Sequence, residues 1–205
     1  TNPHKDYLKT QIKKANGAEK QAGEIGKIFL DEKTKYFRLY QADMKGYKEA
    51  DLKASPYMFS YESESELMIV YSSPSILSTG MYSYSYTGGA HGMYGTSYQV
   101  FDLANKKQLK VKDVLNMRDS LKLAALLERK LRAQFKLKPG QPLSEVLFEN
   151  EISSNDNFFI TSKGIGFNYL PYEIAAFALG EITVFIPFTE LRTMLKPEFV
   201  KLISK

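Results

Sequence analysis

The spacing of hydrophobic and polar positions changes along the chain. Between about residues 6 and 47, scattered apolar positions stand among strong helix formers, which predicts one or two helices. From there the period becomes two, and Tyr57, Phe59 and Tyr61 would lie on one face of a strand. The same period recurs in further segments before residue 104. Several strands are therefore predicted after the amino-terminal helices.

The clearest helix is predicted between Asp119 and Lys136, where Asp119 or Ser120 is placed to cap the first turn. Apolar residues recur in it at spacings of three and four, so they form one stripe for burial. The stripe consists of Ala124, Leu127, Leu131 and Phe135. A Lys-Pro-Gly-Gln-Pro segment then ends the helix.

The C-terminal part combines short strands with short helices. A hairpin is predicted around Ser162–Gly164, and residues 171–180 are expected to form helical turns that Gly180 ends. A strand stopped by Pro187 follows, and the closing helices break near Pro197.

These patterns together predict an α+β fold with a mainly antiparallel sheet and helices packed on one face. The length suits a single domain, residues 1–205, with two lobes, 1–80 and 81–205, as the other possible organisation. Apolar runs are much shorter than the roughly 18 residues that a membrane-spanning helix needs, so none is predicted.

The segment Tyr82–Gly95 is the most unusual, because an alternating Tyr/Ser run leads into a glycine-rich turn with a histidine. Tyr82, Tyr84 and Tyr86 would share one face of a strand, where they either pack beneath a helix or line a groove. Three roles stay open for the turn: shaping the loop, forming the lip of a binding site, or supplying a catalytic base. The residues of the turn are Gly88, Gly89 and His91.

Composition removes most catalytic and metal chemistries. The chain lacks cysteine, which excludes disulfides, thiolate nucleophiles and cysteine-based zinc sites. It has two histidines, His4 and His91, and no P-loop, dinucleotide-binding fingerprint or nucleophile elbow. The sequence therefore designates no catalytic residue, no metal and no cofactor. The net charge of +5 includes a basic run over residues 106–138, which is either a solvated helix face or an attraction for anionic polymers.

Two long segments resemble a bacterial domain family of unknown function. Tyr86–Leu115, YTGGAHGMYGTSYQVFDLANKKQLKVKDVL, contains the family's GGAH turn, a strand ending in Phe-Asp-Leu and the Asp-containing segment that follows. Phe158–Leu195 contains its Pro-Tyr-Glu-Ile-Ala motif and a strand that ends in Ile-Pro. Similar domains form the extracellular region of RsiV-like anti-sigma factors, which bind lysozyme, and the non-catalytic region of PdaC-like peptidoglycan deacetylases.

The resemblance implies an α+β domain outside the cytoplasm that binds a ligand. We expect a non-catalytic envelope module for a cell-wall glycan or for a protein such as lysozyme. The alternative is a hydrolase that acts on cell-wall material with His91 and a nearby carboxylate. Nucleic acid is not an expected partner, and membrane attachment is expected only through a segment outside this chain. The expected ligand-binding residues are Tyr86, Gly88, Gly89, His91, Tyr94, Tyr172 and Glu173.

Charge bears on the protein partner. Lysozymes are usually basic, whereas the net charge of this chain is +5, which disfavours such a complex. The acidic stretch within residues 141–181 is the one region that could compensate. Its acidic side chains include Glu145, Glu149, Glu151 and Asp156.

Overall fold

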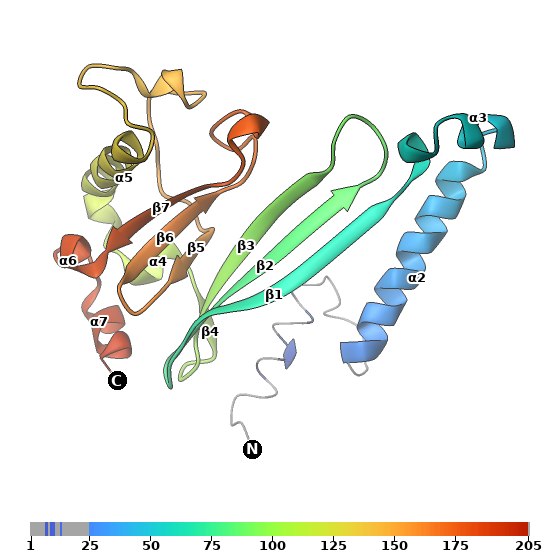
Figure 1. Ribbon diagram of the computed structural model, residues 1–205. Coiled ribbons are helices and arrows are strands. Elements are labelled where there is room, and N and C mark those ends of the chain that lie inside the picture. The colour runs from blue at the N-terminus through green and yellow to red at the C-terminus, as the bar shows by residue number, and fades with distance from the viewer. Residues whose placement is uncertain (1–6, 8, 11–12, 14–24, 205) are drawn as a thin grey trace. The chain divides into compact units, whose positions relative to one another are not determined.

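The computed structural model describes residues 7, 9, 10, 13 and 25–204, and the chain divides into two compact units. Residues 1–62 with 85–92 are named the amino-terminal unit, and residues 63–84 with 93–205 the main unit. Figure 1 labels their elements. These bounds differ from the expected lobes, because the tip of one hairpin groups with the amino-terminal segment.

From residue 25 onward, the amino-terminal unit contains the helices α2 (Ile25–Met44) and α3 (Glu49–Ala54) and the 3-10 helix η1 (Pro56–Phe59). α2 confirms a helix in the segment from residue 6 to residue 47, of which the part before residue 25 lies largely outside the described residues. The 3-10 helix η1 lies where the sequence analysis predicted the start of the first strand.

The strand predicted over Tyr57, Phe59 and Tyr61 is wrong. Pro56 occupies the first turn of η1, where its fixed φ is already that of a helix, and the strand begins only at Glu62. The Tyr61 hydroxyl donates to the Asp43 carboxylate on α2 at 2.7 Å. The period of two was therefore produced by aromatic residues that attach a 3-10 turn to a helix.

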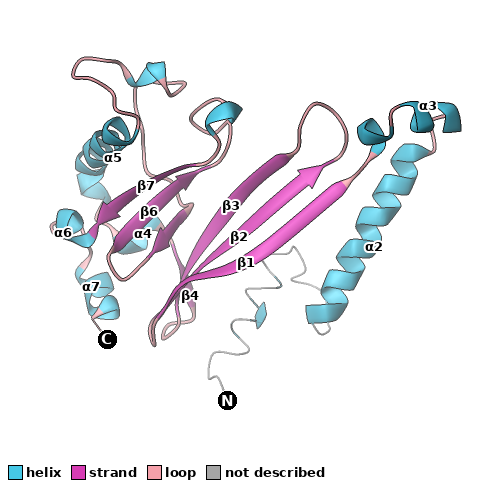
Figure 2. Cartoon of the chain, viewed as in Figure 1, coloured by secondary structure: helices cyan, strands magenta, loops and turns pink. Residues whose placement is uncertain are grey.

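The first sheet has the order β1-β2-β3-β4 (Figure 2). Its strands are β1 (Glu62–Ser72), β2 (Ile76–Tyr86), β3 (Met93–Asp102) and β4 (Lys107–Leu109). In the turn between β1 and β2, the Ser73 N–H donates to the Ile76 carbonyl at 2.8 Å. β4 is short and pairs antiparallel only with Val100–Asp102, so the rest of this β3 edge needs other partners.

The second sheet is antiparallel, has the order β5-β6-β7, and belongs to the main unit. Its strands are β5 (Phe158–Ile160), β6 (Gly164–Tyr169) and β7 (Ile182–Pro187). The predicted hairpin is confirmed, with the Thr161 N–H donating to the Gly164 carbonyl at 3.0 Å. Pro187 ends β7 as predicted.

The predicted long helix is α5 (Ser120–Gln134), which packs against β7. Burial confirms Leu127 and Leu131, whereas Ala124 and Phe135 are only half-buried and Leu123 is buried in addition. The predicted cap is wrong. A 3-10 turn, η2 (Met117–Asp119), runs directly into α5, so Asp119 lacks the extended backbone of a capping residue, and its carboxylate contacts the Lys122 ammonium at 2.7 Å.

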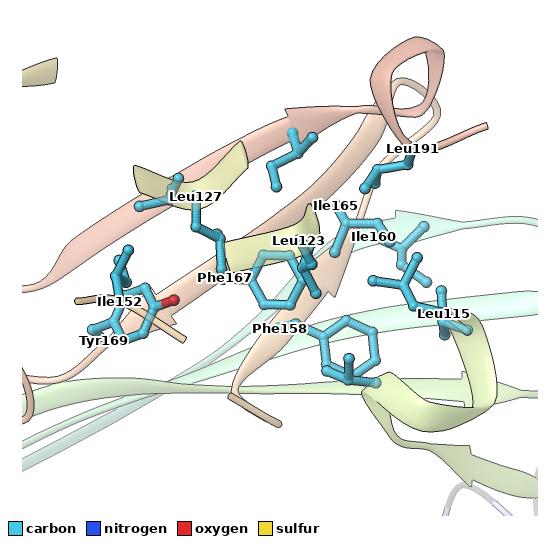
Figure 3. Close-up of a cluster of buried hydrophobic side chains, with 14 of the residues drawn as sticks. Leu115, Leu123, Leu127, Ile152, Phe158, Ile160, Ile165, Phe167, Tyr169 and Leu191 are labelled. Carbon is cyan, nitrogen blue, oxygen red and sulfur yellow. The ribbon is translucent and has the colours of Figure 1, made fainter. Parts of the chain in front are cut away.

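The hydrophobic core lies between the second sheet, α5 and the turn end of the first sheet, from which Ile76 and Val100 join it. Phe158, Phe167 and Leu127 lie in this cluster (Figure 3) and are at most 2% exposed. Full burial of such a side chain contributes about 1.5–3 kcal/mol each. Three short helices surround the cluster: α4 (Val111–Val114), α6 (Phe188–Leu191) and α7 (Pro197–Ile203). The α+β prediction is confirmed, as is the break at the start of α7.

Residues 171–180 form less helix than predicted. Only the 3-10 turn η4 (Phe177–Leu179) is helical, and Gly180 follows it at φ +68°. Tyr172 also has φ +68°, which is incompatible with a right-handed helix. This loop, residues 170–181, joins β6 to β7, and its Glu181 and Phe177 contact residues of β3.

Candidate functional site

The glycine-rich turn is held against η1 within the amino-terminal unit. Gly88 has φ +88°, and a Cβ at this position would lie 2.5 Å from the Met58 carbonyl oxygen. The Tyr86 hydroxyl lies 3.1 Å from the Tyr57 carbonyl and 3.0 Å from the Gly89 carbonyl, and it can donate to either. Only glycine combines this backbone angle with this close approach. The structure thus assigns Tyr86, Gly88 and Gly89 a clear role in shaping the loop.

His91 is exposed in the same loop, and its Nδ1 lies 2.9 Å from the Gly92 carbonyl oxygen. Across the residues that the structure describes, no three His, Cys, Asp or Glu side chains are grouped so that they could hold a metal ion. The hydrogen bond of the His91 ring to the backbone is what a role in shaping the loop predicts, although the ring is exposed.

The acidic residues after β3 organise turns. Asp102 is buried, and its two oxygens accept from the Asn105 N–H at 3.0 Å and the Asn105 side-chain amide at 2.7 Å. Asp113 accepts from the Lys110 N–H at 2.9 Å and the Lys107 ammonium at 2.6 Å. Burial raises the pKa of Asp113, but these hydrogen bonds outweigh it and hold the pKa below its usual value. The carboxylates of Asp102 and Asp113, which belong to the resembling segment Tyr86–Leu115, are therefore both used in hydrogen bonds of the fold.

Glu173, from the Pro-Tyr-Glu-Ile-Ala motif, is exposed but engaged as well. Its Oε2 accepts from the Leu170 N–H at 2.8 Å, which closes the turn after β6. Its Oε1 accepts from the Asn155 side-chain amide at 2.8 Å. The same amide donates to the Asn168 carbonyl at 2.8 Å, so Glu173 is connected to the second sheet.

Three polar side chains satisfy the edge of β3 that β4 leaves open. The Thr96 N–H donates to Glu181 Oε1 at 2.5 Å, and the Thr96 hydroxyl donates to Glu181 Oε2 at 3.0 Å. The Thr96 carbonyl accepts from the side-chain amides of Asn157 at 3.0 Å and Asn168 at 3.1 Å. Asn157 also accepts from the Tyr98 N–H at 2.6 Å. Sequence analysis missed this network, whose one local signal is the polar Asn168 inside the apolar run of β6.

One face of the first sheet carries tyrosines. A Cβ at Gly80 on β2 would lie 2.9 Å from the Tyr98 ring on β3 and 3.3 Å from the Met68 methyl on β1, so these three positions share a face. Because strand side chains alternate, the same face continues toward the far end of β2 and β3 with half-buried tyrosines. Those in the main unit are Tyr82, Tyr84 and Tyr94.

The loop 170–181 extends this aromatic face. The Tyr94 ring meets Phe177 edge-on, with ring centres 5.6 Å apart, and Phe177 lies 5.4 Å from Tyr172. Tyr172 is 51% exposed and keeps φ +68°, a backbone strain of about 1–2 kcal/mol for a residue with a side chain. We define the aromatic surface as Tyr82, Tyr84, Tyr94, Tyr172 and Phe177. The structure thereby brings together two of the expected site residues, Tyr94 and Tyr172.

Carboxylates flank the aromatic surface. Partial burial, followed by the negative charges of Glu64 and Glu181, raises the pKa of the Tyr82 phenol. Glu64 stands on β1, and Glu181 is the residue bonded to Thr96 on the β3 edge. The surface therefore combines apolar rings with hydroxyl and carboxylate oxygens, the composition expected of a polar organic ligand site.

A separate acidic hollow lies in the main unit. Its volume is about 360 Å³, and Phe148, which is 53% exposed, borders it together with three exposed glutamates. These are Glu149, Glu151 and Glu173. Part of the acidic stretch noted in the sequence therefore gathers at one place.

The cations of α5 are paired with neighbouring carboxylates. Arg129 and Lys130 both contact Glu190, the latter at 2.6 Å. Arg132 contacts Glu128 at 2.8 Å, and Lys122 contacts Asp119. This pairing favours the interpretation of the basic run as a solvated helix face.

Comparisons with known proteins agree with this architecture. Residues 2–94 match the family model described as "Deacetylase PdaC", and residues 112–189 match the model described as "Protein of unknown function (DUF3298)". A crystal structure of a DUF3298 family member from Bacteroides fragilis is similar, with a TM-score of 0.86 and 26% identity over 100% of this chain and 84% of that chain. A DUF3298 family protein from Pseudomonas aeruginosa shares the fold, with a TM-score of 0.57 and 22% identity over 68% of this chain and 64% of that chain. No curated protein matches the chain.

The comparisons confirm the resemblance to a domain of unknown function and to PdaC-like proteins. The GGAH turn falls within the PdaC match, and the Pro-Tyr-Glu-Ile-Ala motif falls within the DUF3298 match. The likeness to RsiV-like anti-sigma factors stays a prediction. None of the described helices is both long and apolar enough to cross a membrane.

Proposed function

We propose that the chain is a non-catalytic, extracytoplasmic binding module that recognises a cell-wall glycan through the aromatic surface. One observation carries the proposal: Tyr172 presents an exposed ring on a strained backbone, next to Phe177, whose ring also meets Tyr94. Strain of this kind persists where the surrounding structure enforces it, and it is concentrated at ligand sites. The motif carboxylates Asp102, Asp113 and Glu173, by contrast, are engaged in hydrogen bonds of the fold.

The chemistry of the surface suits a sugar. The apolar face of a pyranose ring can lie on a tyrosine ring, while its hydroxyl groups bond phenol and carboxylate oxygens at the margin. The match to the model described as "Deacetylase PdaC" over residues 2–94 agrees with the resemblance to peptidoglycan deacetylases, and from that resemblance we infer a ligand from the cell wall and a location outside the cytoplasm.

Calorimetry with soluble peptidoglycan fragments tests the proposal. We expect binding with a dissociation constant between about 10 μM and 1 mM for the unmodified chain. Tyr172→Ala should weaken it at least about tenfold, which is about 1.4 kcal/mol. Tyr57→Ala is the matched control, because this ring is 84% exposed but belongs to the amino-terminal unit. Absence of binding, or equal binding by Tyr172→Ala, would overturn the proposal.

Lysozyme is the second candidate ligand, favoured by the acidic hollow at Phe148, Glu149 and Glu151. A basic protein could place a cationic side chain there, and the complex would weaken with salt because screening acts on exposed charges. Glu149→Lys combined with Glu151→Lys should abolish such a complex and leave glycan binding intact. Absence of a complex at tens of micromolar, at low and physiological salt, would end this candidate.

The hydrolase alternative depends on His91. Release of reducing ends or free peptides from cell-wall material, abolished by His91→Ala, would establish it. We expect no release by either the unmodified chain or the variant.

A further inference from the structure

We propose that two copies of this chain pair through the outer edge of β1, antiparallel and centred on Ile69. The proposal goes beyond glycan binding and does not depend on it, because it uses the edge of a strand rather than the aromatic surface. It rests on an apolar run, residues 67–71, that lies at the edge of the first sheet and follows an acidic half of the same strand.

The outer edge of β1 can accept another strand. β1 is the end strand of the first sheet (Figure 1), so one of its edges has no partner within that sheet. Apart from the pairing within the sheet, the backbone hydrogen bonds among the described residues do not include residues 66–72. Free N–H and C=O groups at such an edge are a template for a further strand. The strand is also held in place here, because Tyr71 packs against the core of the main unit.

The side chains of the run leave this edge unprotected. Leu67 is 51% exposed and Ile69 is 70% exposed, and both lie on the face of β1 opposite to Met68. Proteins normally protect an exposed edge of this kind with charged side chains. In β1 the charges stop too early, because Glu64 and Glu66 precede the run and the run itself carries none. The acidic half of the strand therefore opposes pairing, and the apolar half favours it.

A second copy of β1 fits this edge, because the run is complementary to itself in one antiparallel register. When Ile69 lies opposite Ile69 of the second copy, every residue of the run faces an apolar residue. Leu67 then faces Tyr71, and Met68 faces Val70. Every other two-fold symmetric register places a glutamate or a serine against part of the run.

The charges favour the same arrangement. In the register centred on Ile69, Glu66 faces Ser72, and Glu64 lies beyond the end of the other copy's strand. A parallel pair in register would instead place each glutamate opposite its own copy, and like charges directly opposite are destabilising. The antiparallel pair also puts the face of β2 that carries Tyr82 and Tyr84 on the same side of the joined sheet in both copies.

Sedimentation equilibrium of the full chain tests the pairing. One strand pair buries a small area, so we expect a dimer with a dissociation constant of about 10–100 μM. Ile69→Lys places two ammonium groups opposite each other and should keep the chain monomeric at concentrations at which the unmodified chain is dimeric. Because Ile69 is largely exposed, the variant should retain its fold, which circular dichroism checks. Leu121→Lys is the matched control, since Leu121 is 85% exposed on α5, and it should dimerise as the unmodified chain does.

Single cysteines report the register, because the chain has none of its own. Residues directly opposite in an antiparallel pair have Cβ atoms about 4.5–5.5 Å apart, close to the separation in a disulfide. Ile69→Cys should therefore form a disulfide with its own copy under mild oxidation, much faster than Leu121→Cys does. A mixture of Glu66→Cys and Ser72→Cys should form the mixed disulfide, and neither variant should do so with its own copy.

Several results would overturn the proposal. A chain that stays monomeric throughout this concentration range does so, as does Ile69→Cys if it crosslinks no faster than Leu121→Cys. A dimer that survives Ile69→Lys places the interface elsewhere. Crosslinking of Glu66→Cys with its own copy indicates parallel pairing or another register, and it overturns the arrangement centred on Ile69. These results leave the glycan-binding function standing, because Tyr172→Ala tests that function separately.

Discussion

Replacing Glu181 by alanine removes the carboxylate that joins the edge of β3 to the second sheet. The side chain accepts three hydrogen bonds: from the Thr96 N–H at 2.5 Å, the Thr96 hydroxyl at 3.0 Å and the Asn168 amide at 2.9 Å. Thr96 and Asn168 are only 4% and 1% exposed, so water does not readily replace the lost acceptor. The change therefore leaves donors unpaired in the interior of the main unit.

The expected loss follows from those donors. The Thr96 N–H and one N–H of the Asn168 amide lose their acceptor, and each unsatisfied buried donor costs about 1–3 kcal/mol. The Thr96 hydroxyl can rotate toward another acceptor and adds little. We expect the free energy of unfolding to fall by about 2–4 kcal/mol in Glu181→Ala. At about 2–4 °C per kcal/mol for a chain of this size, the melting temperature should fall by about 5–15 °C.

Urea unfolding measures this loss, provided that the dependence on urea concentration is unchanged. Glu190→Ala is the matched control, because Glu190 pairs with the exposed Arg129 and the half-buried Lys130. Surface ion pairs contribute little to stability, so the control should lose much less than Glu181→Ala. Equal losses in the two variants would refute the assignment of the β3 edge network as a stabilising element.

Three further changes test other parts of the structure. Tyr172→Gly should be more stable than Tyr172→Ala by about 1 kcal/mol, because glycine adopts φ +68° without strain whereas alanine does not. Urea unfolding in which the alanine variant is equally stable or more stable would contradict this. Gly88→Ala should destabilise the loop by about 1–3 kcal/mol, since the added Cβ would lie 2.5 Å from the Met58 carbonyl oxygen. Gly89→Ala should cost less, because Gly89 also has a positive φ but has open space for a Cβ. Proteolysis or unfolding assays compare the two variants. Although burial raises the pKa of Asp113, its hydrogen bonds hold it below the unfolded value, so its stabilisation is present above about pH 4 and is lost as the pH falls through the folded pKa. Asp113→Asn should therefore destabilise at neutral pH, and a difference that persists undiminished in strong acid would contradict this.

The sequence by itself determined the elements whose signals are local. α5 and the β5–β6 hairpin follow from hydrophobic periodicity and turn residues within a few positions of one another. Pro187 and Pro197 mark element ends because proline restricts its own φ and removes a donor. The α+β class follows from the order of these elements.

Two predictions from local sequence patterns were wrong because a neighbouring residue or turn favoured another backbone conformation. The alternating aromatic residues from Tyr57 to Tyr61 indicate a strand, but Pro56 favours a 3-10 turn and Tyr61 bonds Asp43 on α2. Likewise, Asp119 has a side chain that could cap α5, but it is the last residue of the 3-10 turn η2 and therefore lacks the extended backbone of a capping residue. In both places the neighbouring structure decided between two local preferences of similar strength.

Only the tertiary structure decided the candidate site. Thr96 and Glu181 are 85 residues apart in sequence, and Thr96 and Asn157 are 61 apart, yet their hydrogen bonds form the edge of β3. The aromatic surface likewise joins Tyr82 and Tyr94 of the first sheet to Tyr172 in a loop between β6 and β7. Periodicity reports which face of a strand is buried, but it carries no information on which distant side chain will satisfy a given donor or extend a given face. That information arises only when the two sheets pack together.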